Sequence, residues 1–235
     1  MGFADLHIHT IYSYDGSASV DAVLNRARSI GLDVIAITDH DGIKGSLMAL
    51  ALATKYDIQV IPGIEVTTSE GDLLVFDVTE KIPRGLPLID TVLKVGEKGG
   101  FCIAPHPMAS GFGMRSLSAD SILLALRRPD VASVLLGIET YNATVLARRK
   151  HDHAHILAEQ LGVAETGSSD AHVAAAVGLG ATEFEGHTKK DLLKALRAGT
   201  TSIYKQKEWN SARILGSWAA NYAGSAFTRL THETS

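Results

Sequence analysis

The sequence contains a single cysteine, Cys102, and this scarcity removes two classes of site. One cysteine cannot form an internal disulfide framework or a cluster of thiolate ligands, so any metal here must use nitrogen and oxygen ligands. Because Cys102 falls within a predicted strand, we expect a small core residue without a chemical role.

The chain also lacks a strong charge imbalance and a long apolar run. Its 22 Lys and Arg against 26 Asp and Glu give a net charge of −4, which provides no broad basic surface for duplex nucleic acid. No apolar stretch reaches the roughly 20 residues that cross a bilayer, and no basic segment precedes an apolar run at the N-terminus. We therefore expect a cytoplasmic protein with no membrane partner; the oligomeric state stays open.

Apolar residues are plentiful enough for one sizeable core, since they make up 46% of 235 residues. Short apolar runs alternate with helix-like segments, a βαβα pattern typical of a parallel sheet or barrel. The predicted strands cover 4–8, 33–38, 59–64, 73–78, 101–104, 134–138, 163–166 and 181–184. The predicted helices lie between Ser19 and Gly31 and over 43–56, 88–98, 118–127, 143–161 and 189–198.

No linker divides the chain, so we expect one domain over residues 1–235, with 205–235 as a C-terminal covering helix. Two helices carry signals at their boundaries. Ser19 is a predicted N-cap and Gly31 a stop, while Thr188 followed by Asp191 is a weak capping box.

Histidines and acids gather where the predicted strands end. In a parallel barrel the carboxyl ends of the strands share one face, which is where active sites are found. An isolated His at a strand end is usually a capping or surface residue, but a buried group of His and carboxylates needs a counter-ion, which a divalent metal provides. The residues concerned are His7, His9, Asp15, Asp39, His40, Glu65, His106, Glu139, Asp170 and His172.

Five segments in order resemble the polymerase and histidinol phosphatase (PHP) superfamily of metal-dependent phosphoesterases. They read "DLHIHTIYSYDGS", "GLDVIAITDHDGIKG", "VIPGIEVTT", "GGFCIAPHP" and "ETGSSDAH". The resemblance implies an α/β fold, a distorted (β/α)7 TIM-like barrel with two or three divalent metals at its mouth. One of the eight predicted strands can then lie outside the barrel.

The resemblance also implies a set of eight metal ligands, of which Asp15 and His172 are the expected catalytic residues. One ion would be held by His7, His9, Glu65 and Asp170, a second by Asp15, His40 and His172, and a third by His106 with bridging Glu65. Asp15 stands where some members have His, which resembles the branch acting on small phosphorylated compounds. Mixed nitrogen and oxygen ligands suit zinc, manganese or iron, and the sequence does not choose among them.

The third ion has the fewest ligands. Many three-metal members carry another His on the strand after Glu65, where this chain has Leu74 or Val75. We predict two firmly held ions and a third that is absent, partly occupied or recruited with phosphate, unless Asp77 supplies the missing oxygen.

The predicted activity is hydrolysis of a small phosphomonoester by metal-bound hydroxide. Two residues are expected to bind substrate: Arg115 as a phosphate clamp, with a solvated surface Arg equally open, and Glu139, which could instead orient a ligand. The alternatives are a phosphodiesterase or exonuclease acting on nucleotides, and a non-catalytic domain that binds metal and a metabolite. Amide or lactone hydrolysis ranks lower.

Overall fold

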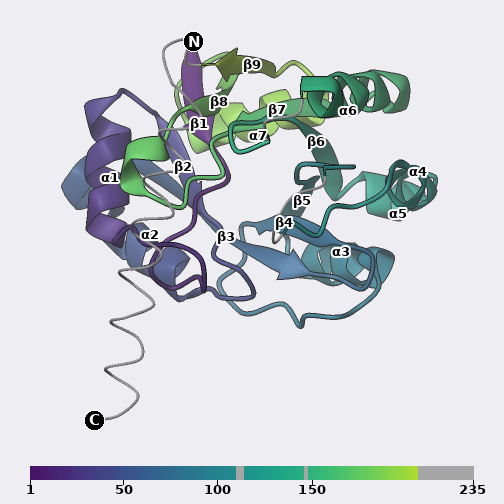
Figure 1. Cartoon of the computed structure of the whole chain (residues 1–235), viewed down its shortest axis with the longest axis horizontal. Coiled ribbons are helices and arrows are strands. Elements are labelled where there is room, and N and C mark those ends of the chain that lie inside the picture. Colours follow the sequence, from purple (N-terminus) through teal and green to yellow (C-terminus); the bar gives the residue numbers. More distant parts are fainter. Residues whose placement is uncertain (110–113, 146–147, 206–235) are drawn as a thin grey trace.

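A nine-stranded sheet organises the part of the chain that the computed structural model describes, residues 1–109, 114–145 and 148–205 (Figure 1). The strands follow the order β7-β6-β5-β4-β3-β2-β1-β8-β9. Their bounds are Gly2–Asp5 (β1), Val34–Ile37 (β2), Gln59–Thr67 (β3), Asp72–Phe76 (β4), Phe101–Ala104 (β5), Leu135–Asn142 (β6), Ala164–Ser168 (β7), Gly180–Phe184 (β8) and Ser202–Lys205 (β9).

Two strands depart from the parallel arrangement that the sequence predicts. β1, β2 and β3 are mutually parallel, as are β5, β6 and β7, but β4 is antiparallel to both of its neighbours and β8 is antiparallel to β1. The prediction is wrong for β4 because a short hairpin, in which Thr67 pairs with Asp72, leaves no room for a crossover helix.

The ring closes between β1 and β7. Beyond these strands, Ile8 forms a parallel bridge with Ala171, and the His9 amide donates to the Ala171 carbonyl at 2.8 Å. Further down, β8 lies beside β7, where the Thr182 hydroxyl donates to the Gly167 carbonyl at 3.0 Å. The predicted distorted TIM-like barrel is confirmed, and all eight predicted strands form. The sequence did not predict β9, a largely exposed edge strand.

Helices cover the outside of the barrel (Figure 1). They are Val20–Ser29 (α1), Lys44–Tyr56 (α2), Leu88–Glu97 (α3), Ala119–Leu126 (α4), Pro129–Ala132 (α5), Arg148–Leu161 (α6) and Lys189–Ala198 (α7). Ser19 caps α1 by accepting from the Ala22 amide, and Thr188 forms the capping box of α7 with Asp191, so both predicted boundaries are confirmed. The four-residue α5 was not predicted.

Apolar side chains fill the barrel below the strand ends that carry the polar cluster. They include Leu6, Ile61, Phe76 and Phe184, and α7 adds Leu192 and Leu196 to the same group. Cys102 is fully buried in a second apolar group, as the sequence predicts. The lower barrel is therefore a packed core, and polar chemistry is confined to the mouth.

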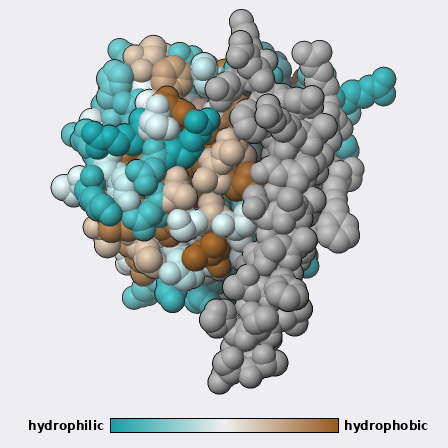
Figure 2. All heavy atoms as spheres, turned by 60° about the vertical axis from the view of Figure 1, so that its left-hand side comes forward, coloured by the Kyte–Doolittle hydropathy of each residue, from teal (hydrophilic) through white to brown (hydrophobic). Residues whose placement is uncertain are grey.

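On the face that carries α1 and α2, hydrophilic residues predominate among those coloured, with smaller apolar patches between them (Figure 2). Among the described residues, none of the helices combines the length and apolar character that crossing a bilayer requires. The predicted C-terminal covering helix lies outside the described residues, apart from Lys205 at the end of β9.

Candidate metal centre

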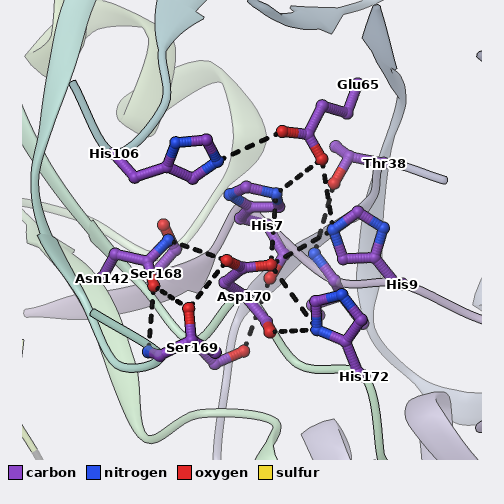
Figure 3. Close-up of polar contacts among 12 residues, drawn as sticks. His7, His9, Thr38, Glu65, His106, Asn142, Ser168, Ser169, Asp170 and His172 are labelled. Atoms are coloured by element: carbon purple, nitrogen blue, oxygen red, sulfur yellow. Dashed lines mark hydrogen bonds and ion pairs between the residues drawn. The ribbon is translucent and has the colours of Figure 1, made fainter. Parts of the chain in front are cut away.

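All eight predicted ligands meet at the mouth of the barrel. Figure 3 shows six of them: His7, His9, Glu65, His106, Asp170 and His172. Four groups of three side chains each bring one potential ligand atom within 4.8 Å of the others. We call His7, His9, Glu65 and Asp170 the inner subsite, and Asp15, His40 and His172 the outer subsite.

The loop after β1 folds back on itself to bring Asp15 to this cluster. Asp39 accepts hydrogen bonds from the Thr10 amide and hydroxyl, at 2.6 and 2.8 Å, and so fixes the start of the loop. The backbone of Gly16 then lies against that of Thr10, so close that a Cβ at Gly16 would lie 2.1 Å from the Thr10 carbonyl oxygen. The "TIYSYDG" segment needs glycine at this point for Asp15 to return to the mouth.

In the inner subsite, two carboxylate oxygens face the same two histidine nitrogens. Glu65 Oε2 lies 3.0 Å from His7 Nε2 and 3.2 Å from His9 Nε2. Asp170 Oδ1 lies 3.5 Å from His7 Nε2 and 3.2 Å from His9 Nε2. All four side chains are at least 95% buried.

These contacts fit a cation better than hydrogen bonds alone. Each Nε2 carries at most one proton yet faces two carboxylate oxygens, so protons cannot satisfy all four contacts together. A tetrahedral ion with bonds of ~2.1 Å separates its ligand atoms by about 3.4 Å, close to the spacing found here. The donor set therefore fits a divalent metal that accepts nitrogen and oxygen.

The close contacts in the inner subsite also shift the pKa values of its residues. Burial lowers the pKa of His9, but hydrogen bonds to Asp170 and Glu65 overcome that effect and raise it to about 10. Burial raises the pKa of both carboxyl groups, yet the surrounding histidines hold each well below its usual range. Without metal, protonated histidines balance the carboxylates, and a bound cation would have to displace those protons.

The outer subsite is more open to solvent. Asp15 Oδ2 lies 3.2 Å from His40 Nε2 and 3.1 Å from His172 Nε2. His172 Nδ1 lies 2.8 Å from the Asp170 carbonyl oxygen, which fixes the proton on Nδ1 and directs Nε2 toward Asp15. The Ser13 hydroxyl donates to Asp15 Oδ1 at 2.6 Å and holds that carboxylate in place.

His106 approaches Glu65 from the opposite side. Its Nε2 lies 3.3 Å from Glu65 Oε1, while its Nδ1 lies 3.1 Å from the Ser116 hydroxyl. The backbone of His106 has a φ of 28°, a conformation that side-chain-bearing residues rarely adopt. Glu65 thus offers one oxygen to the inner subsite and the other to His106, which is the arrangement expected of a bridging ligand.

Glu139 is fully buried behind His7 instead of facing solvent. Its Oε1 lies 3.1 Å from His7 Nδ1 and accepts from the Ser168 hydroxyl, and its Oε2 accepts from the His106 amide at 2.7 Å. A carboxylate on Nδ1 keeps the proton there and leaves Nε2 to a metal. These contacts favour the ligand-orienting role over substrate binding.

The sequence predicted roles for Arg115 and Asp77 in the site, and it did not predict one for Asp72. Arg115 is exposed near the mouth, with Nη2 3.5 Å from the Thr68 carbonyl. Asp77 lies at the far end of β4, paired with Lys189 at 2.7 Å, so it does not supply the missing oxygen. Asp72 starts that strand and lies 1% exposed; burial, followed by the charge of Glu65, raises its pKa to about 6.

The sequence did not predict the residues that hold the predicted ligands in place. Asn142, Ser116 and Ser168 contact the ligands or Glu139, and Asp5 accepts from the Ser169 amide at 3.0 Å beside Asp170. Asn142 and Ser168 stand in the segments "GIETYN" and "GSSDAH", within three residues of a predicted site residue, and that proximity was the one available signal.

Comparisons with known proteins agree with this geometry. A family model described as PHP-associated matches residues 148–201. An uncharacterized protein of Methanocaldococcus jannaschii is 40% identical over 153 residues, covering 60% of this chain and 81% of that protein. An error-prone DNA polymerase of Symbiobacterium thermophilum is 28% identical over 165 residues, or 63% of this chain, but this chain spans 15% of the polymerase.

Solved structures share the fold. A two-domain protein from Bacteroides vulgatus, described as containing a predicted PHP-like metal-dependent phosphoesterase, superposes with a TM-score of 0.71 at 18% identity. The match covers 87% of this chain and 64% of that protein. At this identity the likeness concerns the architecture alone.

Proposed function

Because the chain belongs to the polymerase and histidinol phosphatase (PHP) superfamily, we propose that it is a metal-dependent phosphoesterase that hydrolyses a small phosphomonoester. The observation that carries this proposal is the inner subsite, where two histidine nitrogens are each shared by the same two carboxylates. Such a donor set is built for a cation, and the outer subsite beside it offers a second position.

Substrate would be attracted by charge. Asp15, Glu65 and Asp170 contribute three negative charges, so two divalent ions would leave the ligand shell positive and favour a phosphate dianion. When bound, the ions would polarise phosphoryl oxygens and supply a nucleophile from water at neutral pH, so no protein nucleophile is needed. Zinc, manganese and iron all suit the ligand set.

Two side chains are the proposed catalytic residues because they combine metal-ligand chemistry with access to solvent. Asp15 is 13% and His172 17% exposed, against 5% or less for the inner ligands. His172, with its proton held on Nδ1 by the Asp170 carbonyl, directs Nε2 toward Asp15 in the more exposed part of the centre. Arg115 remains the proposed phosphate clamp at the rim.

A second candidate is a phosphodiesterase acting on nucleotides, favoured by the similarity to part of an error-prone DNA polymerase. The two are separated by steady-state assays of p-nitrophenyl phosphate and bis(p-nitrophenyl) phosphate with Mn²⁺ or Zn²⁺, each with and without chelator. Hydrolysis of the monoester alone is the expected result. Diester hydrolysis alone would favour the second candidate, and metal binding without either activity would indicate a non-catalytic domain.

A further inference from the structure

Asn142, the last residue of β6, stands between the buried carboxylates of Glu139 and Asp170. Figure 3 shows its contact with Asp170. Its Nδ2 lies 2.8 Å from Glu139 Oε2 and 3.1 Å from Asp170 Oδ2, and the residue is 1% exposed. An amide NH₂ group has two protons, so it can satisfy both acceptors at once.

The orientation of this amide follows from Thr144. The Thr144 backbone N–H, which can only donate, lies 2.9 Å from Asn142 Oδ1, so that atom must be the oxygen. A flipped amide would place its oxygen against Glu139 and Asp170 and its NH₂ against a donor. The contacts therefore permit one orientation.

Asp170 is held from the same side by Thr144. The hydroxyl of Thr144 lies 2.9 Å from Asp170 Oδ2 and 2.6 Å from Asn142 Oδ1, and its single proton can serve either acceptor. Asp170 Oδ2 contacts Asn142 and Thr144, whereas Oδ1 faces His7 and His9.

We propose that Asn142, supported by Thr144, is a positioning residue that restricts Asp170 to a single metal-binding oxygen. With Oδ2 held by donors, Asp170 can offer Oδ1 alone to an ion shared with the two histidines. Asn142 also links Asp170 to Glu139, which orients His7 and holds the His106 amide. The inner subsite is thereby fixed from behind by one hydrogen-bonded network.

This inference rests on the metal centre of the proposed function and requires nothing about the substrate. Loss of the outer partner of a metal ligand typically weakens metal binding about 10–100-fold. We expect that range for Asn142→Ala and a smaller loss for Thr144→Val, which removes the hydroxyl and retains the shape. Thr144→Ser keeps the hydroxyl and should bind metal like the wild type.

The test measures Zn²⁺ affinity by competition with a chromogenic chelator, the melting temperature of the metal-free protein, and the visible spectrum of the Co²⁺-loaded protein. Exposed Asn25→Ala is the matched control. Weaker binding and an altered cobalt spectrum in Thr144→Val, restored in Thr144→Ser, would support the proposal even if Asn142→Ala failed to fold.

Wild-type affinity and spectrum in both Asn142→Ala and Thr144→Val would overturn it while leaving the proposed function intact. Lower melting temperatures with unchanged affinity would overturn it in favour of a purely structural role. A wild-type protein that binds no divalent metal would overturn the proposed function, and this inference with it.

Discussion

The inner and outer subsites use the same residue types but are supported differently. The inner side chains are at most 5% exposed. Glu139 holds His7 from behind by accepting from its Nδ1, and Asn142 holds Asp170 by donating to its Oδ2. In the outer subsite His40 is 11% and His172 17% exposed. There, the Ser13 hydroxyl supports Asp15 and the Asp170 carbonyl supports His172.

This contrast leads us to expect that the inner subsite retains its metal ion and that the outer subsite exchanges its ion more readily. A buried, preorganised ligand set binds its ion tightly, because little ordering remains to be done and water cannot compete for the ligands. The outer ligands lie on a loop and near solvent, where an ion and a phosphate can enter together. We expect the inner subsite to anchor the centre and the outer subsite to meet the substrate.

Metal removal is the largest expected effect. Chelation should abolish hydrolysis, and added Mn²⁺ or Zn²⁺ should restore it. Release should be biphasic, with the outer ion leaving first, and dialysed protein should retain no more than two ions. Metal analysis during chelator titration checks this. Full activity in protein shown to be metal-free would refute the mechanism.

The same metal analysis also tests whether the protein retains a third ion. Glu65 Oε1 and His106 Nε2 are 3.3 Å apart, and Asp72 is the acid that starts the neighbouring strand on the same side. In the described structure, Asp72 Oδ1 is buried without a hydrogen-bond partner. If three ions were retained without phosphate, Asp72→Asn would be the variant that tests whether Asp72 holds the third ion. Asp77→Asn, at the far end of β4, is its matched control.

Ligand substitutions should separate the subsites. His9→Ala and Asp170→Asn should each lower kcat by more than the roughly 100-fold that loss of an outer partner costs, because they remove the ligand itself. His40→Ala should lose less, and excess metal should partly restore it, because its ion already exchanges. Circular dichroism and kcat against metal concentration check both claims.

Cys102→Ser is the control for these variants. Burial raises the pKa of the Cys102 thiol well above its usual range, so the thiol stays neutral and has no place in the chemistry. Its kinetics should match the wild type, with a modest loss of stability from burying a hydroxyl. An inactive Cys102→Ser beside an active His9→Ala would put the chemistry elsewhere.

The sequence predicted the ligands better than their supports. The eight predicted ligands, which the structure brings together, each stand in a short local motif next to a strand end. Asn142 could not be predicted in this way, because its role depends on Asp170, 28 residues away, and on a contact that only the closed barrel creates. Ser168 acts on Glu139 across a similar separation of 29 residues.

Strand direction was the other gap. Alternating apolar runs predicted where strands occur, yet they carry no information about whether β4 runs up or down the barrel. Assuming a parallel strand put Asp77 at the mouth. Because β4 is antiparallel, its first residue, Asp72, lies at the mouth and Asp77 pairs with Lys189 at the other end.

The metal-free protein should lose stability as pH rises. The folded-state pKa of His9 is about 10, above its ordinary 6.5, so its ion pairs stabilise the fold fully below pH 6.5 and progressively less up to pH 10. Asp170 and Glu65, whose pKa values are lowered, stay ionised across this window. Metal should replace the lost protons and flatten the dependence.

Melting temperatures at pH 6.5, 8 and 10, with and without Zn²⁺, measure this difference. His9→Ala should make the metal-free profile flatter. A metal-free melting temperature that rises between pH 6.5 and 10 would contradict the assignment of protonated histidines to the inner subsite.

The smallest expected effect lies at the rim, beyond both subsites. Arg115 is exposed, and its carbonyl accepts from the Asp72 amide at 2.6 Å, which holds its backbone beside the mouth. If its guanidinium binds phosphate equally in the ground and transition states, Arg115→Ala should raise KM about 2–5-fold for a phosphomonoester, as expected for one solvent-exposed ion pair, with kcat nearly unchanged. Exposed Arg127, at the C-terminal end of α4, supplies the matched Arg127→Ala control.

Added salt should reduce the difference in KM between Arg115→Ala and Arg127→Ala, because screening weakens an exposed ion pair. Equal KM values for Arg115→Ala, Arg127→Ala and the wild type at low salt would make Arg115 a solvated surface residue and leave phosphate recognition to the metals alone.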